Sequence, residues 1–291
     1  MTDNSMKSIY QKRTRIGDNI LKALIYLAAG VAIALLVGIM GYVFVRGLPQ
    51  VSWQFLSTVQ SSLKGTFGIL GNIINTIYII VITLIIAAPI GIGSAIYLNE
   101  YAKPGKLVRT IEFTTEILSG IPSIIFGLFG MVFFGMTLKL GYSVLTGSFT
   151  LTLMVLPLIT RNTQEALKTV PDSYRSGALG IGATKWYMIR TILLPSAAPG
   201  ILTGVILSIG RIVGESAALL FTAGSGFQLP KNLFGKLFES SGTLTIQLYL
   251  SMQKAKYDQA FGIAVVLLII VLGINLLTRF LTSRFDVTKL K

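Results

Sequence analysis

An arginine and a glutamate lie four residues apart in a strongly apolar stretch of the chain. Arg211 and Glu215 belong to the run 199–223, which is otherwise apolar and long enough to cross a bilayer. A charge at the centre of a membrane helix costs at least ~2.5–3.5 kcal/mol, and such residues usually face a bundle interior or a solute pathway. At this spacing, both side chains point from one helix face. The pair therefore predicts either a solute pathway or an ion pair that holds helices together.

The composition is typical of a membrane protein. Hydrophobic residues make up 53% of the 291 residues, charged residues only 12%, and the mean hydropathy is +0.74. A soluble domain of this length carries about twice that charge. Without cysteine or histidine, the chain lacks disulfides, thiolate chemistry, His-based catalysis and the usual zinc ligands, and we expect no metal or cofactor.

Sequence motifs for nucleotide binding and covalent catalysis are also missing. The chain has no phosphate-binding P-loop, no dinucleotide-binding glycine motif and no nucleophile elbow. We therefore expect no enzymatic activity, and any ATP that drives transport must bind to another chain. The net charge of +14 could indicate nucleic acid, but basic residues that flank apolar spans indicate orientation in a lipid bilayer instead.

Six apolar segments each approach the ~20 residues needed to cross a hydrocarbon core. The predicted fold is an all-α membrane protein with six transmembrane helices. The fourth segment is the weakest, since it is short and contains Pro157. The predicted spans are Leu21–Val45, Ile69–Leu98, Ile111–Met136, Val144–Thr160, Pro199–Ala223 and Ala260–Leu281.

The distribution of basic residues predicts the orientation. With six spans, both termini share one side, which carries 16 Lys and Arg against 7 on the opposite side. Positive residues accumulate in the cytoplasm, so both termini are expected there. We predict a basic cytoplasmic tail over 1–20, a six-span domain over 21–281 and a cytoplasmic tail over 282–291.

Two connections between spans are long. The cytoplasmic one, 161–195, contains helix-breaking glycines and prolines at the spacing of a helix–turn–helix along the membrane surface. Asp172 and Thr184 are the predicted N-caps of its two helices. The alternative is an ordinary solvated loop with turn glycines. The outer connection, 224–258, is too polar to span and too apolar for a free tail.

The cytoplasmic connection resembles the coupling loop of ABC importer permeases. Their motif has the form E-A-A-x3-G-x9-I-x-L-P, and this chain matches its spacing in full, with serine where the motif has glutamate. In that family the loop folds as a coupling helix docked on the ATPase subunit. The resemblance therefore implies an ATPase-coupling role for Pro171, Ser176, Gly177, Ala178, Gly182, Ile192, Leu194 and Pro195.

A narrower resemblance covers nearly the whole chain. The segments 95–101, 118–129, 199–207, 210–223 and 244–249 are similar to the A-type permease of phosphate-specific ABC importers. Such an importer lies in the bacterial cytoplasmic (inner) membrane. It pairs the A-type permease with a C-type permease, two ATPase subunits and an extracytoplasmic phosphate-binding protein. The resemblance thus implies phosphate as the substrate.

The residue chemistry is compatible with phosphate. Arginine offers five N–H donors and stays protonated, so Arg211 could replace the water around an anion, with Glu215 keeping the binding weak enough for release. Alternatively, the two residues neutralise each other or bond across helices. Ser119 and Ser123 flank a proline that could turn polar groups toward a cavity, or they form a small-residue kink for tight packing. Asn72, Asn75 and Thr76 are candidates for interhelical hydrogen bonds.

Two other functions remain open from the residues. One is an ABC permease for another oxyanion, such as sulfate or molybdate. The other is a secondary anion transporter that uses Glu215 as a proton carrier. Secondary transporters often contain internal inverted repeats, of which the sequence has none that is convincing, and the connection 161–195 has no role in that scheme.

Overall fold

The structure is a computed structural model that describes residues 16–61, 65–230 and 232–284. The predicted tails lie mainly outside these residues, as do Lys64 and Lys231. The chain divides into two units, Met1–Arg46 and Gly47–Lys291. Helix α1 (Ile16–Gly47) contains the whole first predicted span, and its apolar side chains are exposed. Exposed apolar residues along a helix of this length are typical of contact with lipid or with other membrane helices.

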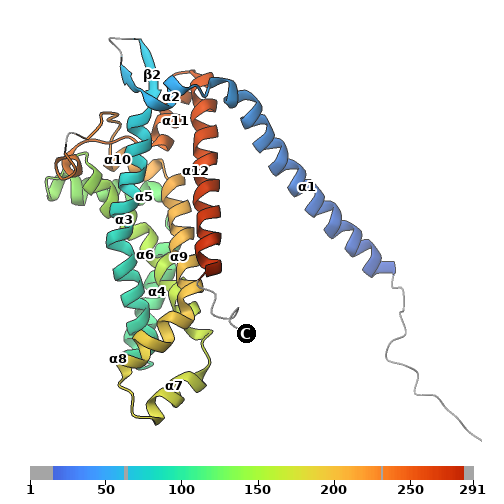
Figure 1. The fold of residues 1–291 in the computed structure, drawn as a ribbon, viewed down its shortest axis with the longest axis vertical. Helices are drawn as coiled ribbons and strands as arrows, with labels where there is room; N and C mark the ends of the chain where they lie inside the picture. The colour runs from blue at the N-terminus through green and yellow to red at the C-terminus, as the bar shows by residue number, and fades with distance from the viewer. Residues whose placement is uncertain (1–15, 62–64, 231, 285–291) are drawn as a thin grey trace, which may run out of the picture. The chain divides into compact units, whose positions relative to one another are not determined.

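Four long helices build the second unit. They are α3 (Leu70–Ile96), α6 (Val144–Lys168), α9 (Leu194–Gly214) and α12 (Tyr257–Arg284), and α3, α6 and α9 pack together (Figure 1). Over the described residues, five helices are long and apolar enough to cross a membrane, or six if a bent pair counts as one span. The all-α membrane fold is therefore confirmed.

The fourth span was predicted too short. Helix α6 continues through Pro157 and ends at Lys168 instead of Thr160, and most of its residues are buried. A proline removes one backbone hydrogen bond, but neighbouring membrane helices can support the interrupted turn. Since Pro157 is itself buried between packed helices, α6 is the central helix of the bundle.

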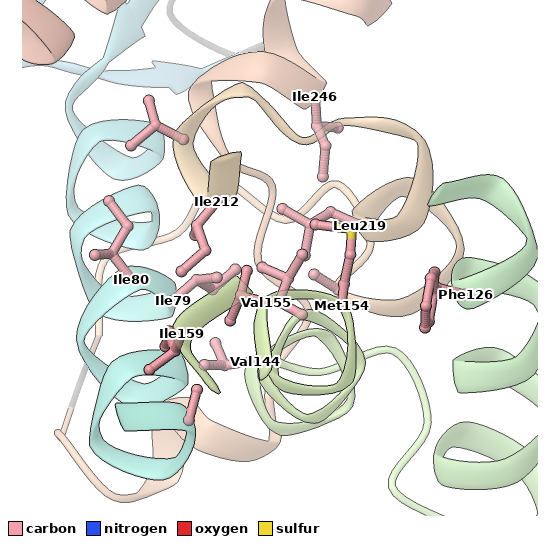
Figure 2. Packing of buried hydrophobic residues seen from close by; sticks show 14 residues of the cluster. Ile79, Ile80, Phe126, Val144, Met154, Val155, Ile159, Ile212, Leu219 and Ile246 are labelled. Atoms are coloured by element: carbon pink, nitrogen blue, oxygen red, sulfur yellow. The ribbon is translucent and has the colours of Figure 1, made fainter. Parts of the chain in front are cut away.

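The hydrophobic core surrounds α6. Figure 2 shows Val144, Met154, Val155 and Ile159 of this helix together with side chains from five other helices. The latter are Ile79 and Ile80 of α3, Phe126 of α5 (Ser123–Gly130), Ile212 of α9, Leu219 of α10 (Ala217–Thr222) and Ile246 of α11 (Leu244–Gln253). Because lipid is as apolar as these residues, close packing rather than escape from water stabilises the contacts.

The third predicted span, Ile111–Met136, is not one straight helix. It consists of α4 (Lys106–Gly120), α5 (Ser123–Gly130) and the π-helix η3 (Met131–Thr137), and the chain bends by 102° between α4 and α5. Proline disfavours the helical conformation in the residue before it, and the backbone at Ile121 and Pro122 is accordingly extended. The bend lets α5 pack on α10 (Ala217–Thr222).

The fifth span begins and ends earlier than the predicted Pro199–Ala223. Helix runs without interruption from α8 (Lys185–Met188) through the π-helix η4 (Ile189–Leu193) into α9, and it ends at Gly214. The N–H of Leu194 bonds to the carbonyl of Ile189, so the register changes directly before Pro195, which has no N–H to donate. The second half of the connection 161–195 is therefore continuous with a membrane helix.

The end of the bundle opposite α7 (Asp172–Gly180) carries short elements (Figure 1). They include an antiparallel pair of strands, in which β1 pairs with β2. The connection 224–258 forms the helix α11 and the 3-10 turn η5. The remaining bounds are η1 (Leu48–Gln50), α2 (Trp53–Ser57), β1 (Val59–Ser61), β2 (Thr66–Ile69), η5 (Gly235–Phe238) and α11 (Leu244–Gln253).

Buried amides on α3 hold this connection in place. The Nδ2 of Asn72 donates to the carbonyl of Gly242 at 2.9 Å, and the Nδ2 of Asn75 donates to the carbonyl of Gly226 at 3.0 Å. Thr76 accepts a hydrogen bond from the backbone N–H of Leu244, the first residue of α11, at 3.0 Å. Among the described residues, the predicted interhelical bond is thus found at Thr76, while the two asparagines instead donate to loop carbonyls of the connection 224–258.

Candidate functional site

Arg211 lies in the last turn of α9 and is partly buried. Its neighbours Ile212 and Val213 are buried in the core, so the side chain of Arg211 projects from another face of the helix. Its guanidinium makes no hydrogen bond or ion pair with any residue that the structure describes. Gly210 and Gly214 beside it are exposed, and an added Cβ at either would meet nothing within 4 Å. The N–H donors of this guanidinium are therefore unpaired within the described residues, beside an exposed surface of a membrane helix.

The sequence predicted that Arg211 and Glu215 share one helix face, and this prediction is wrong. Helix α9 ends at Gly214, and the backbone of Glu215 is extended, with φ −80° and ψ 124°. The carboxylate Oε1 accepts a hydrogen bond from the N–H of Ala218 at 3.0 Å, and the backbone carbonyl accepts one from the Oγ1 of Thr245 at 2.8 Å. A carboxylate on the first free N–H groups of a helix acts as a cap. Within the described residues, the carboxylate of Glu215 therefore supports the N-terminus of α10, which begins at Ala217, and forms no ion pair with Arg211.

The two serines lie on opposite sides of the bend between α4 and α5. Ser119 donates to the carbonyl of Glu116 at 2.7 Å in the last turn of α4, and Ser123 is the first residue of α5. Neither has a hydrogen bond to Arg211 in the described part of the chain. Helix α5 contacts α10 so closely that a Cβ on Gly127 would lie 2.8 Å from the Cα of Ala218. The break after Ser119 and the break at Glu215 therefore precede two helices that pack on each other.

The connection 161–195 contains the predicted helix–turn–helix. The prediction that Thr184 caps the second helix is confirmed, because its Oγ1 accepts a hydrogen bond from the N–H of Tyr187 at 3.3 Å. The prediction for Asp172 is wrong, because α7 begins at Asp172 after Pro171, and its carboxylate pairs with Arg175 at 3.0 Å instead of capping the helix. Pro171 occupies the N-cap position of α7 and has no side-chain acceptor, so no side-chain hydrogen bond caps this helix.

Gly182, two residues after the last residue of α7, has a left-handed backbone conformation with φ +83°. The N–H of Gly182 bonds to the carbonyl of Leu179, and the N–H of Ala183 bonds to the carbonyl of Ala178, each at 3.0 Å. These two bonds form a Schellman motif, in which glycine avoids the steric penalty of a Cβ. The glycine of the coupling motif therefore determines where α7 ends and where the chain turns.

The residues of the coupling motif lie on different sides of the loop. Ala178 is buried against Met188, Ile189 and Leu193, while Ile192 and Leu194 are partly buried beside them. The other motif positions are exposed, namely Pro171, Ser176, Gly177, Gly182 and Pro195.

A group of exposed apolar side chains covers the same loop and was not singled out from the sequence. Ile181 is 87% exposed, directly after α7. The others are Tyr174, Leu179, Trp186 and Tyr187. Exposed aromatic residues at this density are typical of a protein contact surface. Their signal in the sequence was the accumulation of aromatic residues in a connection outside the membrane spans.

Comparisons with known proteins give the family. A family model described as "Binding-protein-dependent transport system inner membrane component" matches residues 87–288. The chain is 35% identical over 282 residues to the probable ABC transporter permease protein YqgI of Bacillus subtilis (strain 168), covering 92% of this chain and 95% of that protein. It is 32% identical over 285 residues to the phosphate transport system permease protein PstA of Mycobacterium leprae (strain TN), covering 94% of this chain and 91% of that protein.

A solved structure shares the fold. The matching chain belongs to a bacterial alginate ABC transporter in complex with its pentasaccharide-bound periplasmic protein, with a TM-score of 0.66 at 18% identity. The match covers 91% of this chain and 96% of that chain. ABC importer permeases act with another permease, with ATPase subunits and with a binding protein, and ATP is hydrolysed on the separate ATPase subunit. Because the family model spans most of the apolar helices and the relatives align over nearly their full length, the chain belongs to the inner-membrane permease subunits of binding-protein-dependent ABC importers.

Proposed function

We propose that this permease subunit translocates inorganic phosphate, with Arg211 as a transient ligand of the ion. The observation that carries the proposal is an arginine in a membrane helix whose guanidinium has no partner among the described residues and stands beside two exposed glycines. Membrane proteins seldom keep an unpaired charge away from a solute pathway or a partner subunit. Relatives named as phosphate transport system permeases support phosphate as the ion.

The chemistry of the site fits a hydrated tetrahedral anion. Phosphate that leaves water needs hydrogen-bond donors and a compensating charge, and the arginine fork supplies both. Glu215 contributes differently from the sequence expectation, because its carboxylate caps α10 and so defines the break in the chain beside the arginine. Ser119 and Ser123 are proposed as pathway hydroxyls at the neighbouring bend.

The proposed assembly contains a C-type permease, two ATPase subunits and an extracytoplasmic phosphate-binding protein. The ATPase subunit would dock on α7 and on the exposed apolar residues Tyr174, Ile181 and Trp186. Serine at position 176 replaces the motif glutamate, so this contact would rest on shape and apolar side chains instead of a carboxylate. A self-sufficient secondary transporter is the wrong class, because members of this family depend on a binding protein.

Competition between oxyanions tests the substrate. Cells that lack other phosphate carriers and contain the complete importer are expected to take up radiolabelled phosphate, and excess unlabelled phosphate should abolish the signal. Excess sulfate or molybdate should leave it unchanged, because a binding protein selects the ion before the permease receives it. Inhibition by sulfate or molybdate, together with uptake of the labelled competitor, would instead assign the chain to another oxyanion importer.

Thiol labelling tests the proposed orientation, with both termini in the cytoplasm. Ser173 in α7 and Lys254 in the connection 224–258 are exposed, and the native chain has no cysteine. Ser173→Cys is expected to react with a membrane-impermeant thiol reagent only after the membrane is opened, whereas Lys254→Cys should react in intact cells. Labelling of Ser173→Cys from outside would invert the topology and remove the docking role of α7.

A further inference from the structure

Arg175 of α7 is hydrogen-bonded through every N–H group of its guanidinium. The Nε donates to both carboxylate oxygens of Glu100, at 3.3 and 3.4 Å. The Nη2 donates to Glu100 at 2.9 Å and to the carbonyl of Leu167 at 3.0 Å. The Nη1 donates to the carbonyl of Val170 at 2.9 Å and to Asp172 at 3.0 Å. An arginine has five such donors, and here none is left for solvent or for another subunit.

These bonds join the coupling helix to two membrane helices. Glu100 belongs to the π-helix η2 (Tyr97–Tyr101), which continues α3. Leu167 lies in the last turn of α6, where helical carbonyls have no partner within the helix, and Val170 follows directly. Because α3 and α6 pack along each other, Arg175 connects α7 to the centre of the bundle.

The other half of the coupling loop reaches the same segment. The ammonium of Lys185, at the start of α8, lies 4.9 Å from the ring centroid of Tyr101, a cation–π contact. Both halves of the coupling loop therefore contact η2, one through Glu100 and the other through Tyr101. Short π-helical turns within longer helices frequently mark functional sites.

The Glu100–Arg175 pair is buried, unlike an ordinary surface salt bridge. The side chains are 4% and 19% exposed, whereas those of Glu165 and Lys168 in the nearby exposed pair are 64% and 55% exposed. Hydrogen bonding to Glu100 and the charges of both carboxylates raise the pKa of Arg175 above its ordinary value, although burial opposes the shift. The arginine therefore stays charged at any physiological pH.

We propose that Glu100 and Arg175 are positioning residues that transmit the movement of α7 to α3 and α6. The proposal rests on the proposed docking of the ATPase on α7. Movement of α7 would then pull the ends of both membrane helices, because the bidentate pair and the two carbonyl bonds hold these elements together. Without the pair, α7 could follow the ATPase while the helices stay behind, so ATP hydrolysis would continue without transport.

Transport per ATP in proteoliposomes tests the link. The complete complex with loaded binding protein is compared with Glu100→Gln, which keeps the shape of the side chain and loses its charge, and with the exposed control Glu165→Gln. We expect Glu100→Gln to keep its ATPase activity while phosphate carried per ATP falls about tenfold, and we expect no change in the control. Unchanged transport per ATP in assembled Glu100→Gln complexes would overturn the proposal.

A milder variant covers the case in which Glu100→Gln does not assemble. Arg175→Lys keeps the charge but cannot form the bidentate contact, and it should lower transport per ATP in the same direction. Failure of both variants to co-purify with the ATPase subunits would mean that the pair supports folding only, and the transmission role would be wrong.

A distance measurement separates this proposal from the choice of substrate. Spin labels at Ser173→Cys in α7 and Lys103→Cys after η2, both exposed, should keep one distance with and without ATP in the otherwise native complex. In Glu100→Gln, ATP should change or broaden that distance. An ATP-dependent distance in the native complex would overturn the link. If phosphate is not the substrate, uptake fails, but this measurement remains valid because it needs only ATP.

Discussion

Arg211→Gln is expected to abolish phosphate uptake while the permease still assembles with its partners. Glutamine keeps two N–H donors but loses the charge that compensates the anion in a low-dielectric setting. Hydrogen bonds to charged groups contribute about 1.5–3 kcal/mol each, so the loss of two should lower uptake by at least ~100-fold. Because Arg211 has no partner among the described residues, its replacement leaves no other charge unpaired within that part of the chain. Radiolabelled phosphate uptake, normalised to the amount of co-purified complex, measures the effect.

Two neighbouring variants serve as controls. Arg211→Lys keeps the charge without the planar fork and should retain intermediate uptake. Glu215→Gln keeps an oxygen that can accept from the N–H of Ala218, so uptake near the native level is expected. A strong loss in Glu215→Gln would mean that its charge acts on the arginine after all. Full uptake by assembled Arg211→Gln complexes would refute the anion-ligand role, and a failure to assemble would assign Arg211 to the subunit interface.

Gly182→Val is expected to uncouple the ATPase from the permease or to prevent their association. Gly182 has φ +83°, a conformation that costs a residue with a Cβ about 1–2 kcal/mol, and more for a β-branched side chain. The strain opposes the two hydrogen bonds that end α7, so the exposed apolar residues around the turn would lose their arrangement. Co-purification of the ATPase subunits and the stimulation of their activity by loaded binding protein should both decrease.

Gly180 provides the matched control two residues away. It is the last residue of α7, and an added Cβ would meet nothing within 4 Å, so Gly180→Ala should be neutral or slightly stabilising. Gly182→Asn should be milder than Gly182→Val, because asparagine tolerates the left-handed conformation. If Gly182→Val shows native co-purification and native stimulation, the turn has no part in coupling.

Much of the fold follows from local patterns of residues. An apolar run of about 20 residues must form a helix in a bilayer, because no water is present to satisfy its backbone groups. That constraint correctly predicted the membrane class, the first and second spans and the last span, which appear as α1, α3 and α12. The turn at Gly182 and the cap at Thr184 were also predictable, since each depends on neighbours within a few residues.

The limits of the local patterns appear at the broken helices. The run 199–223 is uniformly apolar apart from its charged pair, yet the helix ends at Gly214, because the carboxylate and carbonyl of Glu215 bond to Ala218 and Thr245. Hydropathy does not detect such an end, since a residue 30 positions away supplies one of the bonds. For the same reason, four-residue spacing did not place Arg211 and Glu215 on one face.

Long-range packing also decided the two features that carry the functional proposals. The Glu100–Arg175 pair joins residues 75 positions apart, and it forms only because α3, α6 and α7 meet at one end of the bundle. Arg211 is unusual only once its surroundings are known, because an arginine in an apolar run is expected to find a counter-ion. The sequence could therefore indicate a charged membrane helix and a coupling loop. Which charges are paired, and which helices move together with α7, depends on contacts that form only when distant segments pack.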